Sequence, residues 1–246
     1  MKDRPHSEAL PTATELRRFA TVSVWVFDLD NTLYPRHVNL FQQVDKRIRD
    51  YVGQLLDIGP EEAQRVQKDY YQRYGTTLRG LMEEHGIQPD DFLEYVHDID
   101  HSVVKADPRL AAAIAGLPGR KFIFTNGSRA HAEKVAERLG IPDHFEEIFD
   151  IVSSELLPKP NRETYDLFLR STGVDPVRAA MFEDLARNLE VPKALGMATV
   201  LVVPHGTREV LTEDWELEGR DAPHVEFVTD DLASFIEAVL AVRRPG

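Results

Sequence analysis

The chain has 246 residues, a length that suits one large domain or a core with a smaller insertion. Hydrophobic residues make up 42% of it, enough for a buried core, and the lack of cysteines excludes disulfides, thiolate nucleophiles and cysteine metal sites. The formal net charge of −13 argues against nucleic acid or an anionic membrane as a partner, because phosphate groups attract clustered Lys and Arg.

The first 20 residues are polar and are interrupted by Pro5 and Pro11. We expect a loosely ordered leader here, with one helical turn near Glu15–Phe19. The segment lacks the apolar stretch of a secretory signal, and no later apolar run approaches the length needed to cross a membrane. The sequence therefore favours a cytoplasmic protein without a membrane partner, and it leaves the oligomeric state open.

The run TVSVWVF at 21–27 is short, apolar and β-branched, which predicts a buried strand. The pattern from Pro35 to about residue 105 is helical instead. Proline and glycine signals there begin or end helices near residues 60, 77 and 89, and no convincing strand interrupts them. The first of these helices is marked by apolar residues at helical spacing: Phe41, Val44, Ile48, Val52 and Leu55. The segment 36–105 is thus predicted to be an all-helical insertion.

Strands and helices alternate after Pro108. Strands are expected at 121–125, 148–152, 179–182, 198–203 and 225–228, and helices at 128–139, 161–172, before Gly196 and from Asp231. This alternation predicts an α/β fold with a doubly wound parallel sheet. The Rossmannoid core would comprise residues 21–35 and 106–246, with 36–105 as a helical cap. Residues 204–224 are polar and are expected to form a long loop.

Two acidic residues follow the first strand in the stretch VFDLDNTLYP at 26–35. A side-chain period of two places Asp28 and Asp30 on one side of the chain and Leu29 on the other. Two acids held so close repel each other and lose solvation unless a cation or a proton lies between them. The pair therefore indicates either a metal ion or a role in proton transfer.

Further polar residues fall at the predicted carboxyl ends of strands, where open α/β sheets bind ligands. One strand-end carboxylate alone is more often a helix cap or a surface charge. Several such positions in one chain, each at the end of a different strand, favour a binding site. They are Thr125 with Asn126, Lys159, and Glu183 with Asp184.

The order D-x-D-N-T, T-N-G, K-P and E-D closely resembles that of the haloacid dehalogenase-like (HAD) superfamily, over nearly the whole chain from about residue 21. This resemblance implies a Rossmannoid core with a C1-type helical cap and an aspartate nucleophile. Asp28 would attack phosphorus to form an aspartyl-phosphate, and Asp30 would act first as an acid and then as a base. Thr125 and the backbone of Asn126 would bind phosphate oxygens. Lys159 would neutralise charge on the phosphate and on Asp28.

The resemblance also implies a Mg²⁺ ion, held by the Asp28 carboxylate, the Asp30 main-chain carbonyl and Asp184. A set of oxygen ligands together with a phosphate suits Mg²⁺. Glu183 would act through a water molecule, and Asn188 would support the ligands from behind. The dehalogenase branch needs neither a metal nor the second acid, so Asp30 favours a phosphatase.

A narrower resemblance, to the pyrimidine 5′-nucleotidase-like group, implies a pyrimidine nucleoside monophosphate as the substrate. The alternatives are another small phosphate, such as a sugar phosphate or phosphoglycolate, and a catalytically idle binding protein. The group usually has D-D-S where this chain has Leu185 after its last acid pair, so the effect of this leucine is open. The resemblance rests on DNTLYP, YGTTLRGL (74–81), DPRL (107–110), FTNGSRAHAEKVAERLGI (124–141) and PKPNRETY (158–165).

Two features of the helical insertion have more than one interpretation. Thr76, Thr77 and Arg79 would recognise the leaving group, because discrimination among esters must come from what covers the phosphate site. An ordinary helix cap on the outer surface explains the same residues equally well. His97 and His101, four positions apart, could ligate zinc, although a solvated face where the cap rejoins the core is the simpler explanation.

Overall fold

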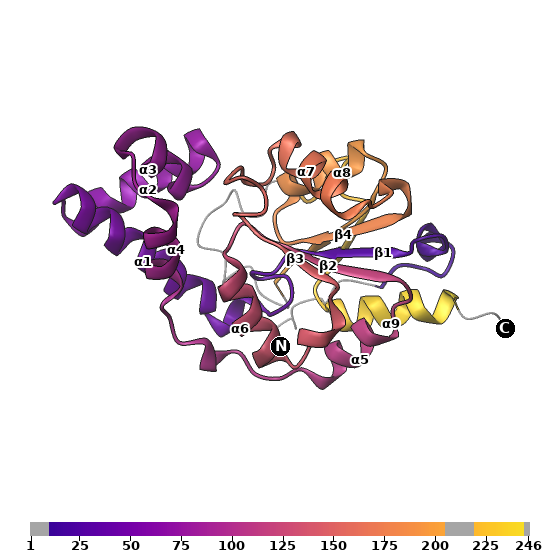
Figure 1. The fold of residues 1–246 in the computed structure, drawn as a ribbon. Coiled ribbons are helices and arrows are strands. Elements are labelled where there is room, and N and C mark those ends of the chain that lie inside the picture. The colour runs from indigo at the N-terminus through magenta and orange to yellow at the C-terminus, as the bar shows by residue number, and fades with distance from the viewer. Residues whose placement is uncertain (1–9, 205–218, 244–246) are drawn as a thin grey trace, which may run out of the picture.

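The structure is a computed structural model that describes residues 10–204 and 219–243. Its centre is one six-stranded parallel sheet in the order β3-β2-β1-β4-β5-β6 (Figure 1). The predicted α/β fold with a doubly wound sheet is thereby confirmed. The strands are β1 (Val24–Phe27), β2 (Arg120–Phe124), β3 (Glu147–Phe149), β4 (Ala179–Glu183), β5 (Ala198–Val202) and β6 (Phe227–Thr229).

Strand β1 lies at the centre because its residues are apolar on both faces. Trp25 and Phe27 point into the cluster on one side of the sheet, and Val24 and Val26 into the cluster on the other. The chain pairs β1 with β2 on one edge and with β4 on the other, so the strand order reverses at this point. Ligands of open α/β sheets bind at such a reversal, beyond the carboxyl ends of the strands.

Helices cover both faces of the sheet. In Figure 1, α5 and α9 lie below it and α7 and α8 above it. Helices α5, α6 and α9 contribute to the core cluster that contains Trp25, and α7 to the cluster that contains Val26. These helices are α5 (Pro108–Gly116), α6 (Arg129–Leu139), α7 (Arg162–Thr172), α8 (Glu190–Ala194) and α9 (Leu232–Arg243).

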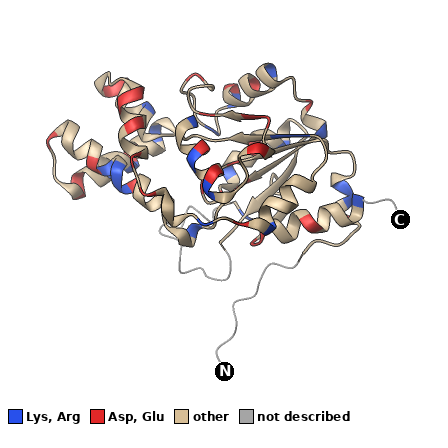
Figure 2. Cartoon of the chain, turned by 60° about the horizontal axis from the view of Figure 1, so that its bottom comes forward, with Lys and Arg blue, Asp and Glu red and all other residues tan. Residues whose placement is uncertain are grey.

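Four more helices lie between β1 and β2 and form a separate lobe, on the left of Figure 1. They pack around a third hydrophobic cluster, which includes Tyr70, Leu81 and Phe92 and is joined by Ile151 from the segment after β3. Acidic and basic side chains are scattered over the helices of both lobes (Figure 2). These helices, the predicted cap, are α1 (Leu40–Leu56), α2 (Pro60–Tyr74), α3 (Thr77–His85) and α4 (Pro89–His97).

Several boundaries differ from the expectation. Residues Glu15–Phe19 form a 3-10 helix whose Leu16 and Phe19 are buried in the main core, so this part of the expected leader is packed rather than loose. Residues 1–9 of the leader, and most of the loop expected at 204–224, lie outside the described residues. The helix expected before Gly196 is divided into a 3-10 turn at Ala186–Leu189 and α8. None of the helices in the described part of the chain is long and apolar enough to cross a membrane.

Candidate active site

Asp28 is the first residue after β1, and its backbone N–H donates to the carbonyl of Phe182 on β4 at 2.9 Å. Because β1 ends at Phe27, strand alternation does not explain why Asp28 and Asp30 belong to one site, contrary to the expectation. A turn does so instead, with the N–H groups of Thr32 and Leu33 donating to the carbonyl of Leu29. The polypeptide then leads into the cap.

Lys159 lies at the centre of the acidic residues, and its ammonium group uses three hydrogen bonds. It donates to Asp28 Oδ1 at 2.8 Å, to Glu183 Oε1 at 2.6 Å and to the carbonyl of Phe124 at 2.7 Å. Burial alone would lower the pKa of Lys159, but the two carboxylates outweigh it and raise the pKa, so the ammonium stays charged. The Asn126 side chain fixes the lysine backbone, accepting from its N–H at 2.8 Å and donating to its carbonyl at 3.2 Å.

Glu183 is fully buried, and protein donors occupy both of its oxygens. Oε1 accepts from Lys159 and from Asn188 Nδ2, at 2.9 Å in the latter case, while Oε2 accepts from the N–H of Leu185 at 3.1 Å. Lys159, Asn188 and the backbone of Leu185 thus hold Glu183 in one orientation. Leu185 thus contributes to the site through its backbone N–H.

Asp184 accepts two hydrogen bonds at Oδ2, from Asn31 Nδ2 at 3.3 Å and from Arg36 Nη2 at 3.1 Å. Burial and the neighbouring carboxyl of Glu183 raise the pKa of Asp184 to about 7. Asn31 and Arg36 were not among the predicted site residues. Asn31 stands inside the quoted motif, whereas Arg36 precedes the cap and shows no sequence signal of its contact with Asp184.

The carboxyl groups can hold a metal ion. One oxygen of each of Asp28, Glu183 and Asp184 lies within 4.8 Å of the others. Burial, and after it the carboxyls of Glu183, Asp184 and Asp30, raise the pKa of Asp28 well above its ordinary value despite Lys159. Burial is the first cause of both raised pKa values and the neighbouring carboxyls add to it, and a divalent cation would stabilise the ionised form of both groups. The side chain of Glu183 is fully buried, whereas those of Asp28 and Asp184 each keep 10% of their exposure, so Asp28 and Asp184 are the side chains that would hold the ion.

Asp30 is bound from one side by two residues that were not predicted. Its Oδ1 accepts from Tyr34 Oη at 2.5 Å and from His131 Nε2 at 3.0 Å. Burial alone would raise the pKa of Asp30, but these two partners outweigh it and lower the pKa. Tyr34 is four residues from Asp30 and could have been found from the quoted stretch, whereas His131 is separated from it by 101 positions.

Thr125 and Asn126 follow β2, whose end adjoins that of β1. Thr125 is buried, and its Oγ1 accepts from the N–H of Gly127 at 2.9 Å in a tight turn. A Cβ atom at Gly127 would come within 3.3 Å of Thr125 Oγ1 and 3.7 Å of Asp30 Oδ2, so glycine keeps this space open beside both side chains. The turn thus lies at the acid cluster, and phosphate binding by Thr125 and Asn126 stays a prediction.

The three cap residues have local partners. Thr76 is the N-cap of α3, where its side chain accepts from the N–H of Arg79 at 3.2 Å. Thr77 is buried and donates to the carbonyl of Gln67 at 3.2 Å. These contacts favour the helix-cap interpretation for both threonines. Arg79 pairs with Glu83 one turn further along the helix at 2.6 Å. It also lines a pocket of about 280 Å³ between the cap and the loop around Lys159, together with Tyr74, Gly75, Glu83, Leu157, Pro158, Pro160 and Asn161.

His97 and His101 are not a solvated face. His97 is buried and stacks on His131 with the ring centroids 4.5 Å apart, while His101 Nε2 lies 3.0 Å from His131 Nδ1. Within residues 10–204 and 219–243, the only group of three potential metal-ligating side chains is the one at Asp28, and it does not include these histidines. The two residues instead connect the cap to α6.

The family comparison matches residues 22–196 to the haloacid dehalogenase-like hydrolases. A curated relative, Phosphate metabolism protein 8 of Saccharomyces cerevisiae, is 26% identical over 237 residues, covering 89% of this chain and 71% of its own. A HAD phosphatase from Thermococcus onnurineus has a TM-score of 0.59 at 16% identity, over 91% of this chain and 100% of its own. The L-2-haloacid dehalogenase from Xanthobacter autotrophicus has a TM-score of 0.57 at 17% identity, over 89% and 98%. Likeness at these identities shows a shared fold.

Proposed function

The chain belongs to the haloacid dehalogenase-like hydrolases, and from that premise we propose that it is a magnesium-dependent phosphomonoester hydrolase with an aspartyl-phosphate intermediate. The observation that carries this proposal is the convergence of four side chains at the strand reversal. Asp28 from the end of β1, Asp184 from the end of β4, and the buried Lys159 surround one point, with Asp30 beside them. A phosphatase needs all four, whereas displacement of a halide requires neither Asp30 nor a metal.

The proposed roles follow from the contacts. Asp28 attacks phosphorus, and Lys159 stabilises negative charge on the carboxylate and on the transferring group. Asp30 gives a proton to the leaving oxygen, and it later takes one from the water that hydrolyses the aspartyl-phosphate. The pKa of Asp30 is lowered in the free protein, but an arriving phosphate brings negative charge close to it and favours its protonated form.

Asp28 and Asp184 would hold a Mg²⁺ ion, which when bound would offset the charge of the phosphate oxygens. Glu183 and Asn188 fix Lys159 and the end of β4 from behind. Arg36 pairs with Asp184 and so reduces the repulsion between the acids in the metal-free protein. Burial and the carboxyl of Glu183 outweigh Arg36, so the pKa of Asp184 is still raised, to about 7.

As the substrate we propose a pyrimidine nucleoside 5′-monophosphate, on the strength of the motif resemblance in the cap and the core. The curated relative carries the name Phosphate metabolism protein 8, which agrees with chemistry on phosphate and does not identify the ester. The alternative is another small phosphorylated metabolite. The pocket lined by Tyr74 and Arg79 lies beside the loop of Lys159, where it could take the leaving group of either.

Release of inorganic phosphate tests the proposal. The full-length protein would be incubated with pyrimidine and purine nucleoside monophosphates, sugar phosphates, phosphoglycolate and an aryl phosphate, with Mg²⁺ or with excess chelator. We expect turnover that needs Mg²⁺, with the highest kcat/KM for the pyrimidine nucleotides. Release from none of these esters would contradict the phosphatase assignment, and preference for a sugar phosphate would contradict only the substrate.

A further inference from the structure

A row of histidines, buried at His97 and His131 and half-buried at His101, connects the cap linker to the side chain of Asp30. We propose that His131 is a positioning residue for the proton donor Asp30, and that His101 on the linker between α4 and α5 holds His131 in place. The inference rests on the proposed phosphatase function and deepens it, because it names the residues that aim the proton at the leaving group.

The contacts at Asp30 select one of its oxygens. His131 Nε2 and Tyr34 Oη both donate to Oδ1, at 3.0 and 2.5 Å. Oδ2 lies on the side of Gly127, since a Cβ atom at that glycine would come within 3.7 Å of it. The two donors therefore fix the rotation of the carboxyl group and turn Oδ2 toward the turn after β2, where phosphate binding is predicted.

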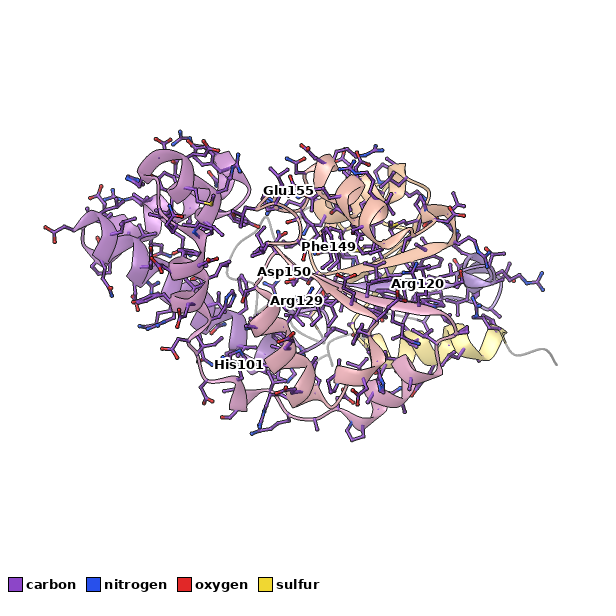
Figure 3. The ribbon with its side chains drawn as sticks, viewed as in Figure 1. His101, Arg120, Arg129, Phe149, Asp150 and Glu155 are labelled. Carbon is purple, nitrogen blue, oxygen red and sulfur yellow. The ribbon has the colours of Figure 1, made fainter. Side chains whose placement is uncertain are left out.

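His131 is itself held on every side. Its side chain is fully buried on the first turn of α6, where its backbone N–H donates to Ser128 Oγ at 3.3 Å. The same end of α6 is anchored by Asp150, which accepts from the N–H of Arg129 at 3.0 Å. Figure 3 shows Arg129 and Asp150 close together at this end of the helix. These contacts hold the part of the backbone that carries the His131 side chain.

The cap linker fixes the direction of the ring. His101 Nε2 lies 3.0 Å from His131 Nδ1, and its own Nδ1 lies 3.1 Å from the carbonyl of Ile99. Because a carbonyl can only accept, Nδ1 of His101 carries the hydrogen and a neutral His101 presents the lone pair of Nε2 to His131. Figure 3 shows His101 on the segment that leads from the cap to α5.

A third imidazole packs on the same ring. His97, the last residue of α4, stacks on His131 with an angle of 19° between the ring planes. Burial, and after it the charge of His131, lower the pKa of His97 to about 3, so this ring stays neutral against its neighbour. His97 at the end of the cap and His101 on its linker therefore both contact His131, the residue that orients Asp30.

A substitution series with two substrates tests this assignment. His131→Leu removes both ring nitrogens at a similar volume, and His131→Gln keeps a donor that can reach Asp30. An alkyl phosphate needs a proton on its leaving oxygen, whereas p-nitrophenyl phosphate does not. His131→Leu should lower kcat for the alkyl phosphate by about ten- to a hundredfold, the range of a hydrogen bond to a charged group. It should change the aryl rate and both KM values less than about threefold, and His131→Gln should restore most of the alkyl rate.

His101→Leu should give a smaller loss of the same kind, and in the double variant it should add nothing to His131→Leu, because it acts through that residue. The matched control is His85→Leu, which removes a cap histidine that contacts Tyr70 instead; its rates should equal those of the wild type. If His131→Leu does not fold, the rates of His131→Gln and His101→Leu on the alkyl and aryl phosphates test the positioning role instead.

Equal losses on both substrates, a change confined to KM, or independent effects of the two histidines would overturn the positioning role alone. A wild-type protein that hydrolyses neither ester would overturn the phosphatase proposal and this inference with it.

Discussion

Replacing Asp184 by asparagine tests the charge balance of the site, because it removes one buried negative charge and keeps the shape of the side chain. Burial and the carboxyl of Glu183 raise the pKa of Asp184 from its ordinary 3.8 to about 7. The folded protein therefore binds this proton more tightly than the unfolded chain, and stability falls as the pH rises from below 3.8 through about 7. At about 1.36 kcal/mol for each pKa unit, the full loss is about 4 kcal/mol.

Asparagine does not ionise, so the variant should not lose this stability as the pH rises. Metal-free Asp184→Asn should be more stable than the wild type at pH 8, by up to about 4 kcal/mol, and equal to it at pH 4. The assay is urea unfolding followed by circular dichroism in excess chelator. The matched control is Asp166→Asn, which removes a partly exposed carboxyl that pairs with Arg162 at 3.0 Å. Its stability should stay within about 0.5 kcal/mol of the wild type at both pH values.

Adding Mg²⁺ at pH 8 should reduce or reverse the difference in stability between Asp184→Asn and the wild type. A ligand that binds only the folded state adds about 2.7 kcal/mol at a hundred times its Kd, and the wild type should gain this while the variant gains less. A difference between the two proteins that stays the same from pH 4 to pH 8 would refute the charge-balance reasoning. Equal stabilisation of both by Mg²⁺ would refute Asp184 as a ligand.

Four further substitutions test separate roles. Asp28→Asn should reduce turnover below detection with an unchanged circular dichroism spectrum, because an amide is a poor nucleophile; measurable steady-state turnover would count against the covalent route. Asp30→Asn should slow alkyl phosphates by about 10²–10⁴-fold and aryl phosphates much less, which parallel assays of the two esters measure; equal slowing would argue against proton transfer. Arg79→Ala should lower kcat/KM for a nucleotide more than for an aryl phosphate, since it lines the pocket beside Lys159, whereas Thr77→Val should lower stability in urea rather than selectivity.

The parts of the site that the sequence predicts are those that follow strands. Asp28, Thr125 and Asp184 each stand directly after an apolar run or one residue beyond it, and parallel strands bring their carboxyl ends to one edge. Their placement requires only the strand order. Lys159 was also singled out by its place beyond a predicted strand, but it belongs to a loop, and its contact with Asp28, which spans 131 positions, was indicated only by the family resemblance.

The supporting residues could not be predicted in this way. His131 reads in the sequence as one position of an ordinary helix, and Arg36 as a charge at the entrance to the cap. Their contacts with Asp30 and Asp184 depend on how α6 and the cap pack against the sheet, which local patterns do not encode. For Thr76 and Thr77, the sequence was compatible with both interpretations, and only the contacts to Arg79 and Gln67 favoured one.

The separate hydrophobic cluster of the cap affects how such proteins can diverge. Among the described buried members of that cluster, only Ile151 comes from outside the segment 36–105. Substitutions inside this cluster can therefore accumulate with little effect on the layers that hold Asp28 and Lys159, which depend on other clusters. On the proposed function, we expect descendants of one ancestral chain to keep the site around Asp28 while residues of the cap cluster change. The choice of ester would then vary largely independently of the capacity for hydrolysis.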